Sequence, residues 1–430
     1  MSDVEHSYRQ VLQDRRLAVL LGGDVASKIG DGMDVVALPL LALRIHGSVN
    51  PALAVGLISA APYTLAVAVS LVFGLGRRRF RPRGLLMTDC LVRFVVLTGV
   101  ALLAVAGVLP LWALGVALFV GSGLRLLALS SRRLVAADLA GERGRFAVNG
   151  LLGTGDSLAV YVIGPVLGGV LATAVSPGFV LLLDGISFVG LLAAVRVAVP
   201  PGTSDPAEAA TGPAADAASG WSILRRVPVA AWLFVVVFCF NLFYMPVEVA
   251  LPLLVHGPLH ADGTALGNIW TSFGVGALLG ALCTGLLRRL PQTALLVGII
   301  GGWGGAVIFL AAAPNVATAA VAFAVGGLIY APFTPVAYSL VQSKLRPDQQ
   351  QPVLTLWAAG SAVAAPVGLI LAGPLVQLAG TRPSLVVSAA LTLALVPAAV
   401  HARHRRGRRR LDDHHPTPTL TGNQRVRGGA

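Results

Sequence analysis

The six residues VALPLL occur at residues 36–41 and again, letter for letter, at residues 249–254. Each copy ends a long apolar stretch. In both places one glycine and two arginines follow VALPLL at nearly the same distance: Gly74, Arg77 and Arg78 after the first copy, and Gly285, Arg288 and Arg289 after the second. We interpret these matches as the trace of a duplication, so that the chain consists of two related halves.

The composition indicates that both halves lie in a membrane. Of 430 residues, 56% are hydrophobic and only 12% are charged, and the mean hydropathy is +0.79. A helix needs about 20 mostly apolar residues to cross a bilayer. Twelve such stretches occur, at residues 17–43, 52–75, 84–107, 110–131, 147–173, 177–199, 229–254, 264–287, 293–313, 315–341, 353–379 and 383–401. The sequence therefore predicts an all-α membrane protein with twelve transmembrane helices, arranged as two six-helix halves related by pseudo-twofold symmetry.

The basic residues predict how the chain lies in the membrane. The net charge is +13, and the Lys and Arg residues concentrate before span one, in every second connection and after span twelve. The other connections carry little that is basic beyond Arg44 and Arg382. Because cytoplasmic loops are enriched in Lys and Arg, we expect a multi-pass protein of the inner (cytoplasmic) membrane with both termini in the cytoplasm. The basic runs are then anchors beside anionic lipid rather than sites for nucleic acid.

The same pattern predicts the order of segments. We expect a cytoplasmic tail at 1–16, one half at 17–199, a cytoplasmic linker at 200–228, the second half at 229–401 and a basic tail at 402–430. The linker is expected to be flexible, because its first part is rich in Pro, Ala, Gly and Ser. Both VALPLL copies start their helices on the cytoplasmic side, so the halves are parallel repeats related by an axis along the membrane normal.

Five motifs carry a resemblance to a known family: KIGDGMDVVALPLLAL in span one, TDCLVRF in span three, GPVLGG in span five, LLLDGISFVGLL in span six and NLFYMPVEVALPLLV in span seven. With them the chain resembles the major facilitator superfamily, in particular the branch of the enterobactin exporter and the macrolide-efflux proteins. GPVLGG is the most specific of the five, since Gly164, Pro165, Gly168 and Gly169 match the fifth-helix motif of antiporters in this superfamily. Small residues at this spacing let helices approach closely, and packing without any bearing on transport direction is the alternative.

One motif of the superfamily is altered in this chain. The loop between spans two and three usually has an acidic residue four positions after its first glycine, where GLGRRRFRPR has Arg78. Asp89 and Arg93 lie one helical turn apart at the start of span three. They are candidates for a gate-side ion pair in place of the missing one, with a local salt bridge as the alternative.

Span one carries four charged residues in spite of their cost in a bilayer: Asp24, Lys28, Asp31 and Asp34. At 100° per residue they fall within an arc of about 120°, so they form one stripe that faces the bundle interior. The spacing favours Asp24 as the partner of Lys28. Asp31, Asp34 and, from span seven, Glu248 are therefore candidates for proton or cation binding in a central cavity. A purely structural network between helices is the alternative.

Further polar and aromatic residues complete the candidate site. Arg125 stands where many proton antiporters of the superfamily have a basic residue, and Asp156 and Asp184 are possible partners for it. Together with Asp24 and Lys28, Arg125 and Asp156 form the expected charge network. Substrate-cavity candidates are Asn241, Trp270, Tyr330 and Trp357.

These features indicate a secondary active transporter rather than an enzyme. The histidines lie mostly in loops and tails and the three cysteines lie inside spans, which does not match a reactive constellation or a metal site. We expect a monomeric, proton-coupled exporter of an amphipathic small molecule such as a drug, antibiotic or siderophore. It would work by alternating access with no cofactor other than the proton gradient, and its partners would be substrate, protons and lipid. A proton-coupled importer of a nutrient is the alternative, because fold does not fix direction.

The topology can be tested with single cysteines at Ser48 and Ser204 in a chain without Cys90, Cys239 and Cys283. In intact cells a membrane-impermeant thiol reagent should label the variant at Ser48 and leave the variant at Ser204 unlabelled. Labelling after permeabilisation serves as the control for reactivity. The reverse pattern would exclude the arrangement with both ends inside.

Overall fold

The computed structural model describes residues 8–75, 81–200, 213–284, 287 and 290–397. Within these residues the chain forms helices and no strands. The first half consists of α1 (Tyr8–Gln13), α2 (Arg15–Ile45), α3 (Pro51–Leu75), α4 (Pro82–Val105), α5 (Leu111–Gly121), α6 (Arg125–Leu158), the π-helix η1 (Ala159–Ile163), α7 (Gly164–Ala174) and α8 (Pro177–Ala198). Then follow α9 (Pro213–Arg226), α10 (Pro228–His256), α11 (Gly263–Cys283), α12 (Gln292–Ala312), α13 (Val316–Tyr330), α14 (Phe333–Gln342), α15 (Pro347–Ala379) and α16 (Thr381–Leu393).

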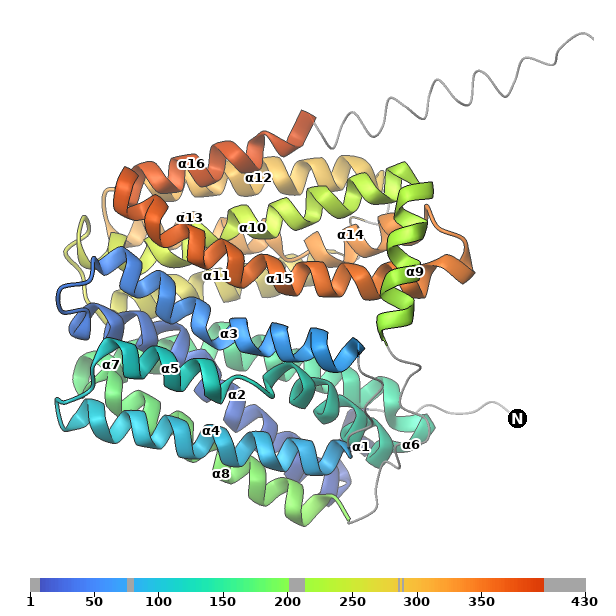
Figure 1. Cartoon of the computed structure of the whole chain (residues 1–430), viewed down its shortest axis with the longest axis horizontal. Helices are drawn as coiled ribbons and strands as arrows, with labels where there is room; N and C mark the ends of the chain where they lie inside the picture. Colours follow the sequence, from blue (N-terminus) through green and yellow to red (C-terminus); the bar gives the residue numbers. More distant parts are fainter. Residues whose placement is uncertain (1–7, 76–80, 201–212, 285–286, 288–289, 398–430) are drawn as a thin grey trace, which may run out of the picture.

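The two halves lie side by side with their long helices roughly parallel (Figure 1). Within the described part of the chain, nine helical stretches are long and apolar enough to cross a membrane, counting residues 111–174 as one stretch. α2 is 31 residues long but carries the four charges of span one in its middle. The prediction of an all-helical membrane protein built from two halves is confirmed. The count of twelve spans stays a prediction.

Two expected spans are broken at corresponding places in the halves. The span expected at 110–131 ends as α5 at Gly121 and restarts as α6 at Arg125, and the span expected at 315–341 is divided into α13 and α14 by a turn before Phe333. Gly123 lies in the first break and Pro332 in the second. Pro lacks the backbone N–H that the helix needs at this point, and Gly disfavours the helical backbone. The break places Arg125 at the first turn of a new helix.

The expected linker contains a helix. Residues 201–212 lie outside the described residues, as do Arg77, Arg78, Arg288, Arg289 and the tail at 402–430, but residues 213–226 form α9. α9 runs across the ends of the long helices at the side of the molecule where α1 lies (Figure 1). At Gly220 it contacts the backbone of Pro352 in α15. This part of the linker therefore packs on the second half, because a glycine permits a close approach.

Small residues bring α2, α7 and α11 into backbone contact. A Cβ atom added to Gly164 would lie 2.5 Å from the Cα atom of Gly32 in α2, and one added to Gly169 would lie 2.6 Å from the carbonyl oxygen of Gly263 in α11. Next to this contact the Thr271 hydroxyl of α11 donates a hydrogen bond to the carbonyl oxygen of Val162 at 3.1 Å. The GPVLGG segment thus contacts α2 of its own half through one face and α11 of the second half through another.

The contacts between the halves lie toward one end of the molecule. Near the start of α3, this helix of the first half contacts α15 of the second half. A Cβ atom on Gly56 would lie 3.1 Å from the carbonyl oxygen of Leu369 there. The backbone N–H of Thr264 donates to the Thr173 hydroxyl at 3.1 Å. Gly56 and Thr264 lie near the starts of α3 and α11, Thr173 lies at the end of α7, and Leu369 lies in the second half of α15. The two halves are therefore closed against each other toward that end.

The close packing of α7 on α2 predicts that Gly168 accepts no side chain. A Cβ atom there would lie 2.5 Å from the carbonyl oxygen of Met33, so Gly168→Leu should lower the free energy of unfolding by about 1–3 kcal/mol through overpacking. The measurement is thermal unfolding of the purified protein in detergent. Gly99→Leu is the matched control, because a Cβ atom on Gly99 meets nothing within 4 Å. Equal stability of both variants would contradict the packing described here.

Candidate functional site

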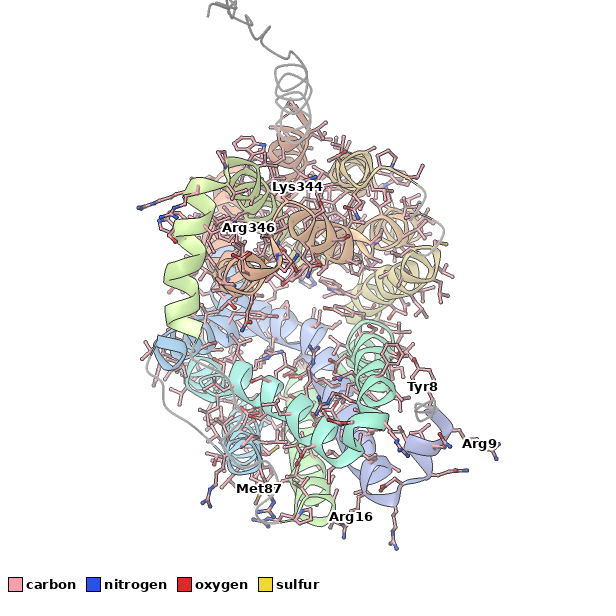
Figure 2. The ribbon with its side chains drawn as sticks, turned by 90° about the vertical axis from the view of Figure 1, so that its right-hand side faces the viewer. Tyr8, Arg9, Arg16, Met87, Lys344 and Arg346 are labelled. Carbon is pink, nitrogen blue, oxygen red and sulfur yellow. The ribbon has the colours of Figure 1, made fainter. Side chains whose placement is uncertain are left out.

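A cavity of about 780 Å³ lies between the two halves. Figure 2 looks along the helices toward it, from the end that carries Arg9 and Arg16 on one half and Lys344 and Arg346 on the other. The first half contributes most of its charged wall: Lys28, Asp31, Asp34, Asp89, Arg93, Arg125, Arg132 and Asp156. The second half contributes a different set, with Tyr244, Glu248, Trp270, Phe273 and Tyr330.

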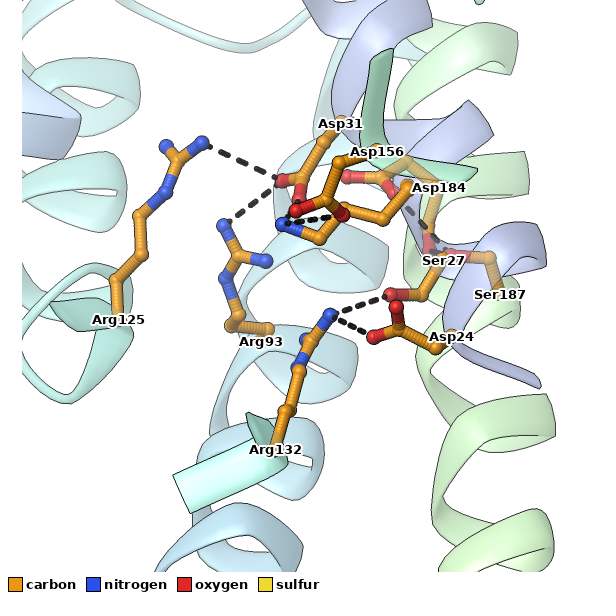
Figure 3. A network of polar contacts seen from close by, with 10 residues as sticks. Asp24, Ser27, Asp31, Arg93, Arg125, Arg132, Asp156, Asp184 and Ser187 are labelled. Carbon is orange, nitrogen blue, oxygen red and sulfur yellow. Dashed lines mark hydrogen bonds and ion pairs between the residues drawn. The ribbon is translucent and has the colours of Figure 1, made fainter. Parts of the chain in front are cut away.

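Asp31 is the centre of the charged wall (Figure 3). Its Oδ1 atom accepts a hydrogen bond from Arg93 Nη2 at 3.1 Å and lies 3.6 Å from Arg125 Nη2. Its Oδ2 atom lies 3.9 Å from Lys28 Nζ. Three cations from α2, α4 and α6 therefore surround one carboxylate whose side chain is only 8% exposed. This arrangement offsets the cost of placing the charges away from water.

Further ion pairs extend the network along α2. Lys28 Nζ also lies 3.7 Å from Asp156 Oδ1 of α6. Arg132 Nη1 donates to Asp24 Oδ1 at 2.8 Å and to the Ser27 hydroxyl at 3.2 Å (Figure 3). The expected charge network of Asp24, Lys28, Arg125 and Asp156 is thus brought together, but through different pairs.

Three expected pairings are corrected by these contacts. Asp24 pairs with Arg132 and not with Lys28, because the Arg132 side chain crosses from α6 to α2. Arg125 pairs with Asp31, whereas Asp156 and Asp184 were its expected partners. In each case a long basic side chain reaches a carboxylate on a neighbouring helix, α6 to α2.

Asp89 and Arg93 do not form the expected gate-side ion pair. The Arg93 guanidinium is directed to Asp31 and lies 4.4 Å from the centroid of the Phe188 ring. Asp89 is 1% exposed, and its Oδ1 atom has no hydrogen-bond donor within the part of the chain that the structure describes. Both residues line the cavity. The one-turn spacing predicted a pair within α4, but the partner of Arg93 is on α2.

Asp34 has a different environment from Asp31. It faces the fully buried Asp184 of α8, with which it interacts directly. Oδ1 of Asp34 and Oδ2 of Asp184 have no hydrogen-bond donor among the described residues. The Ser187 hydroxyl donates to Asp184 Oδ1 at 3.2 Å. Two carboxyl groups in contact form a hydrogen bond only when one of them carries a proton, so the pair suits a shared proton.

The second-half candidates fall into two groups. Trp270 and Tyr330 line the cavity next to Glu248. Trp357 is 2% exposed in the core, 6.0 Å from the ring of Phe234, and does not line it. Asn241 does not line it either, and its side chain donates to the carbonyl oxygen of Val237 in its own helix at 2.8 Å. The prediction of Asn241 and Trp357 as cavity residues is therefore wrong, because helical spacing alone left their faces undetermined.

Several residues of the site were not predicted, among them Arg132, Tyr161 and Tyr244. Arg132 was assigned to the basic run after span four, but α6 continues as a helix beyond it and buries its side chain. Tyr161, in η1, lines the cavity and contacts Gly274 of the second half. The signal that could have identified Tyr161 is its place three residues before GPVLGG. No local pattern distinguishes Arg132 from the neighbouring Arg133, since both lie in the same apolar context.

Similar sequences provide a comparison over nearly the whole chain. Multidrug efflux pump Tap of Mycolicibacterium fortuitum is 26% identical over 395 residues, which cover 89% of this chain and 95% of the relative. Multidrug efflux pump Tap of Mycobacterium tuberculosis is 25% identical over 399 residues, with 88% and 90% covered. The narrower prediction of the enterobactin-exporter and macrolide-efflux branch stays a prediction.

Solved structures show the same fold. The nucleoside transporter NupG superposes with a TM-score of 0.74 at 11% identity, covering 90% of this chain and 99% of that structure. The human organic anion transporter MFSD10 superposes with a TM-score of 0.60 at 16% identity, covering 92% and 100%. The profile of the Major Facilitator Superfamily matches residues 32–262 and 247–425, which together take in both halves and the cavity between them. The chain belongs to the Major Facilitator Superfamily.

Proposed function

We propose that this transporter is a proton-coupled exporter of amphipathic, drug-like molecules in the inner membrane, with both termini in the cytoplasm and a single chain as the working unit. The names of the relatives from Mycolicibacterium fortuitum and Mycobacterium tuberculosis, both multidrug efflux pumps, support the direction and the substrate class. The fold supports alternating access, in which two halves rock about a site between them. No cofactor is required beyond the proton gradient.

The observation that carries the proposal is the closure of the cavity at one end only. The halves meet through Gly169 and Gly263 and through Gly56 and Leu369 at that end. The charged wall of the cavity extends to Arg132 of α6. Figure 2 views the molecule from the opposite end. That end carries Arg9 and Arg16 of one half and Lys344 and Arg346 of the other, which supports it as the cytoplasmic end by the positive-inside rule. A cavity open to the cytoplasm is the state in which an exporter binds its substrate and an importer releases it, so the direction of transport rests on the names of the relatives.

The geometry favours Asp34 over Asp31 as the proton carrier. Protonation of Asp31 would leave Lys28, Arg93 and Arg125 without their common anion. Asp34 makes no ion pair with any described Lys or Arg and faces another carboxyl group, so gain or loss of one proton there breaks no ion pair. Asp34 also lines the cavity. A proton on this pair is therefore close to bound substrate, as coupling requires.

The coupling is tested with Asp34→Asn and Asp31→Asn in everted membrane vesicles with an imposed pH gradient, acidic inside, and a panel of fluorescent drug-like dyes. The Asp34→Asn variant should still bind dye, but its uphill accumulation of dye in the vesicles should fall by more than about tenfold. A single proton moving down 100 mV supplies about 2.3 kcal/mol, enough for a gradient of roughly 50-fold. Asp348→Asn, an exposed residue of α15, is the control.

Different results lead to different conclusions. If Asp34→Asn accumulates dye as well as the parent, the Asp34 and Asp184 pair is structural and the proton moves elsewhere. If dye moves with the protons rather than against them, the protein is an importer, which is the alternative direction for this fold. Asp31→Asn should instead lower the stability of the protein, because it removes the common partner of three cations.

A further inference from the structure

The two walls of the cavity differ in how their charges are balanced. On the first half the cations have anionic partners: Lys28, Arg93 and Arg125 contact Asp31, and Arg132 contacts Asp24. On the second half, Glu248 is the one charged residue among the described residues that line the cavity. The first wall is therefore largely neutralised from within, whereas the second presents a single carboxylate.

Glu248 has no partner in the described part of the chain. No Lys, Arg or His lies within ion-pair distance of it there, and no described group donates a hydrogen bond to it. It lies in the middle of α10, one turn after Tyr244. A carboxylate in this position is costly unless a positive charge approaches it. Since no described side chain supplies that charge, it comes from outside the chain, as a proton or as a cationic ligand.

Aromatic side chains line the cavity together with Glu248. The ring centroids of Tyr244 and Tyr330 are 5.5 Å apart. The ring centroid of Phe273 lies 6.0 Å from that of Tyr330 and 6.1 Å from that of Trp270. Behind them Trp303 stacks on Tyr244 at 5.1 Å, which holds the first layer of rings in place. Ring faces attract cations, and the attraction is stronger where water is excluded.

We propose that Glu248, Tyr244, Trp270, Phe273 and Tyr330 form a binding site for aromatic cations, which we call the cation wall. This rests on the proposed transport function and specifies its substrate class. The positive group of the ligand lies against Glu248 and its apolar body against the rings. The volume of about 780 Å³ suits a drug-sized molecule.

The test uses tetraphenylphosphonium, whose charge does not depend on pH, and triphenylphosphine oxide, a neutral molecule with three of the same four rings. Equilibrium binding of each is measured to the purified full chain in detergent. Glu248→Gln should weaken binding of tetraphenylphosphonium by at least about tenfold, or about 1.4 kcal/mol, and leave triphenylphosphine oxide nearly unchanged. Glu248→Asp, which keeps the charge, should retain most of the affinity. Tyr330→Leu should weaken both probes.

Three results would overturn the cation wall: no binding of tetraphenylphosphonium to the parent chain, equal affinity of the parent for both probes, or equal affinity of the parent and Glu248→Gln for tetraphenylphosphonium. The second comparison needs no variant, so it decides the matter even if a substitution prevents folding. Binding in detergent requires no proton gradient. Gradient-driven export of other dyes together with failure here would therefore leave the proposed function standing and remove only the substrate class.

Discussion

The structure depends on the cost of placing charge inside a membrane protein. α2 carries Asp24, Lys28, Asp31 and Asp34 in its central turns, and each of them needs a partner from a neighbouring helix or from the cavity. Asp31 draws Arg93 from α4 and Arg125 from α6 into one cluster. Removal of Asp31 would leave Arg93 and Arg125 without their common partner, and an unpaired buried charge costs far more than the ion pair stabilises. The first half is thereby held around α2.

A second constraint is backbone contact through small residues. The charges on α2 occupy one face, and Gly32 and Met33 on the other side meet Gly164 and Gly168 of α7. Gly169, one residue further, meets the second half. A rocking motion of the halves must therefore break the contacts of Gly169 while it keeps those of Gly164 and Gly168. One face of α7 therefore stays packed within the first half, while its neighbouring face forms a contact with the second half that opens and closes.

Much of this fold could be predicted from the sequence, and the site only in part. The duplicated VALPLL, the long apolar stretches and the arginine pattern are local signals, and they predicted two helical halves. The charged stripe of α2 predicted a cavity-facing surface for the same reason. The partners within the site could not be predicted, because Arg132 and Arg93 reach other helices and sequence spacing reports only neighbours on the same helix. Asn241 and Trp357 failed for a related reason, since an apolar helix shows no spacing that separates its faces.

The π-helix η1 changes the direction in which the side chains after it point around the axis of the fifth span. A π turn contains one residue more than an α turn, and one residue is worth about 100° of rotation around the helix axis. Before η1, Asp156 points to Lys28 on α2, and after η1, Gly164 packs against Gly32 on the same helix. The extra residue thus adjusts the phase so that an ionic face and a glycine face both address α2. Deleting one residue between Ala159 and Ile163 would turn every side chain of α7 away from its present neighbour, although composition and length would hardly change.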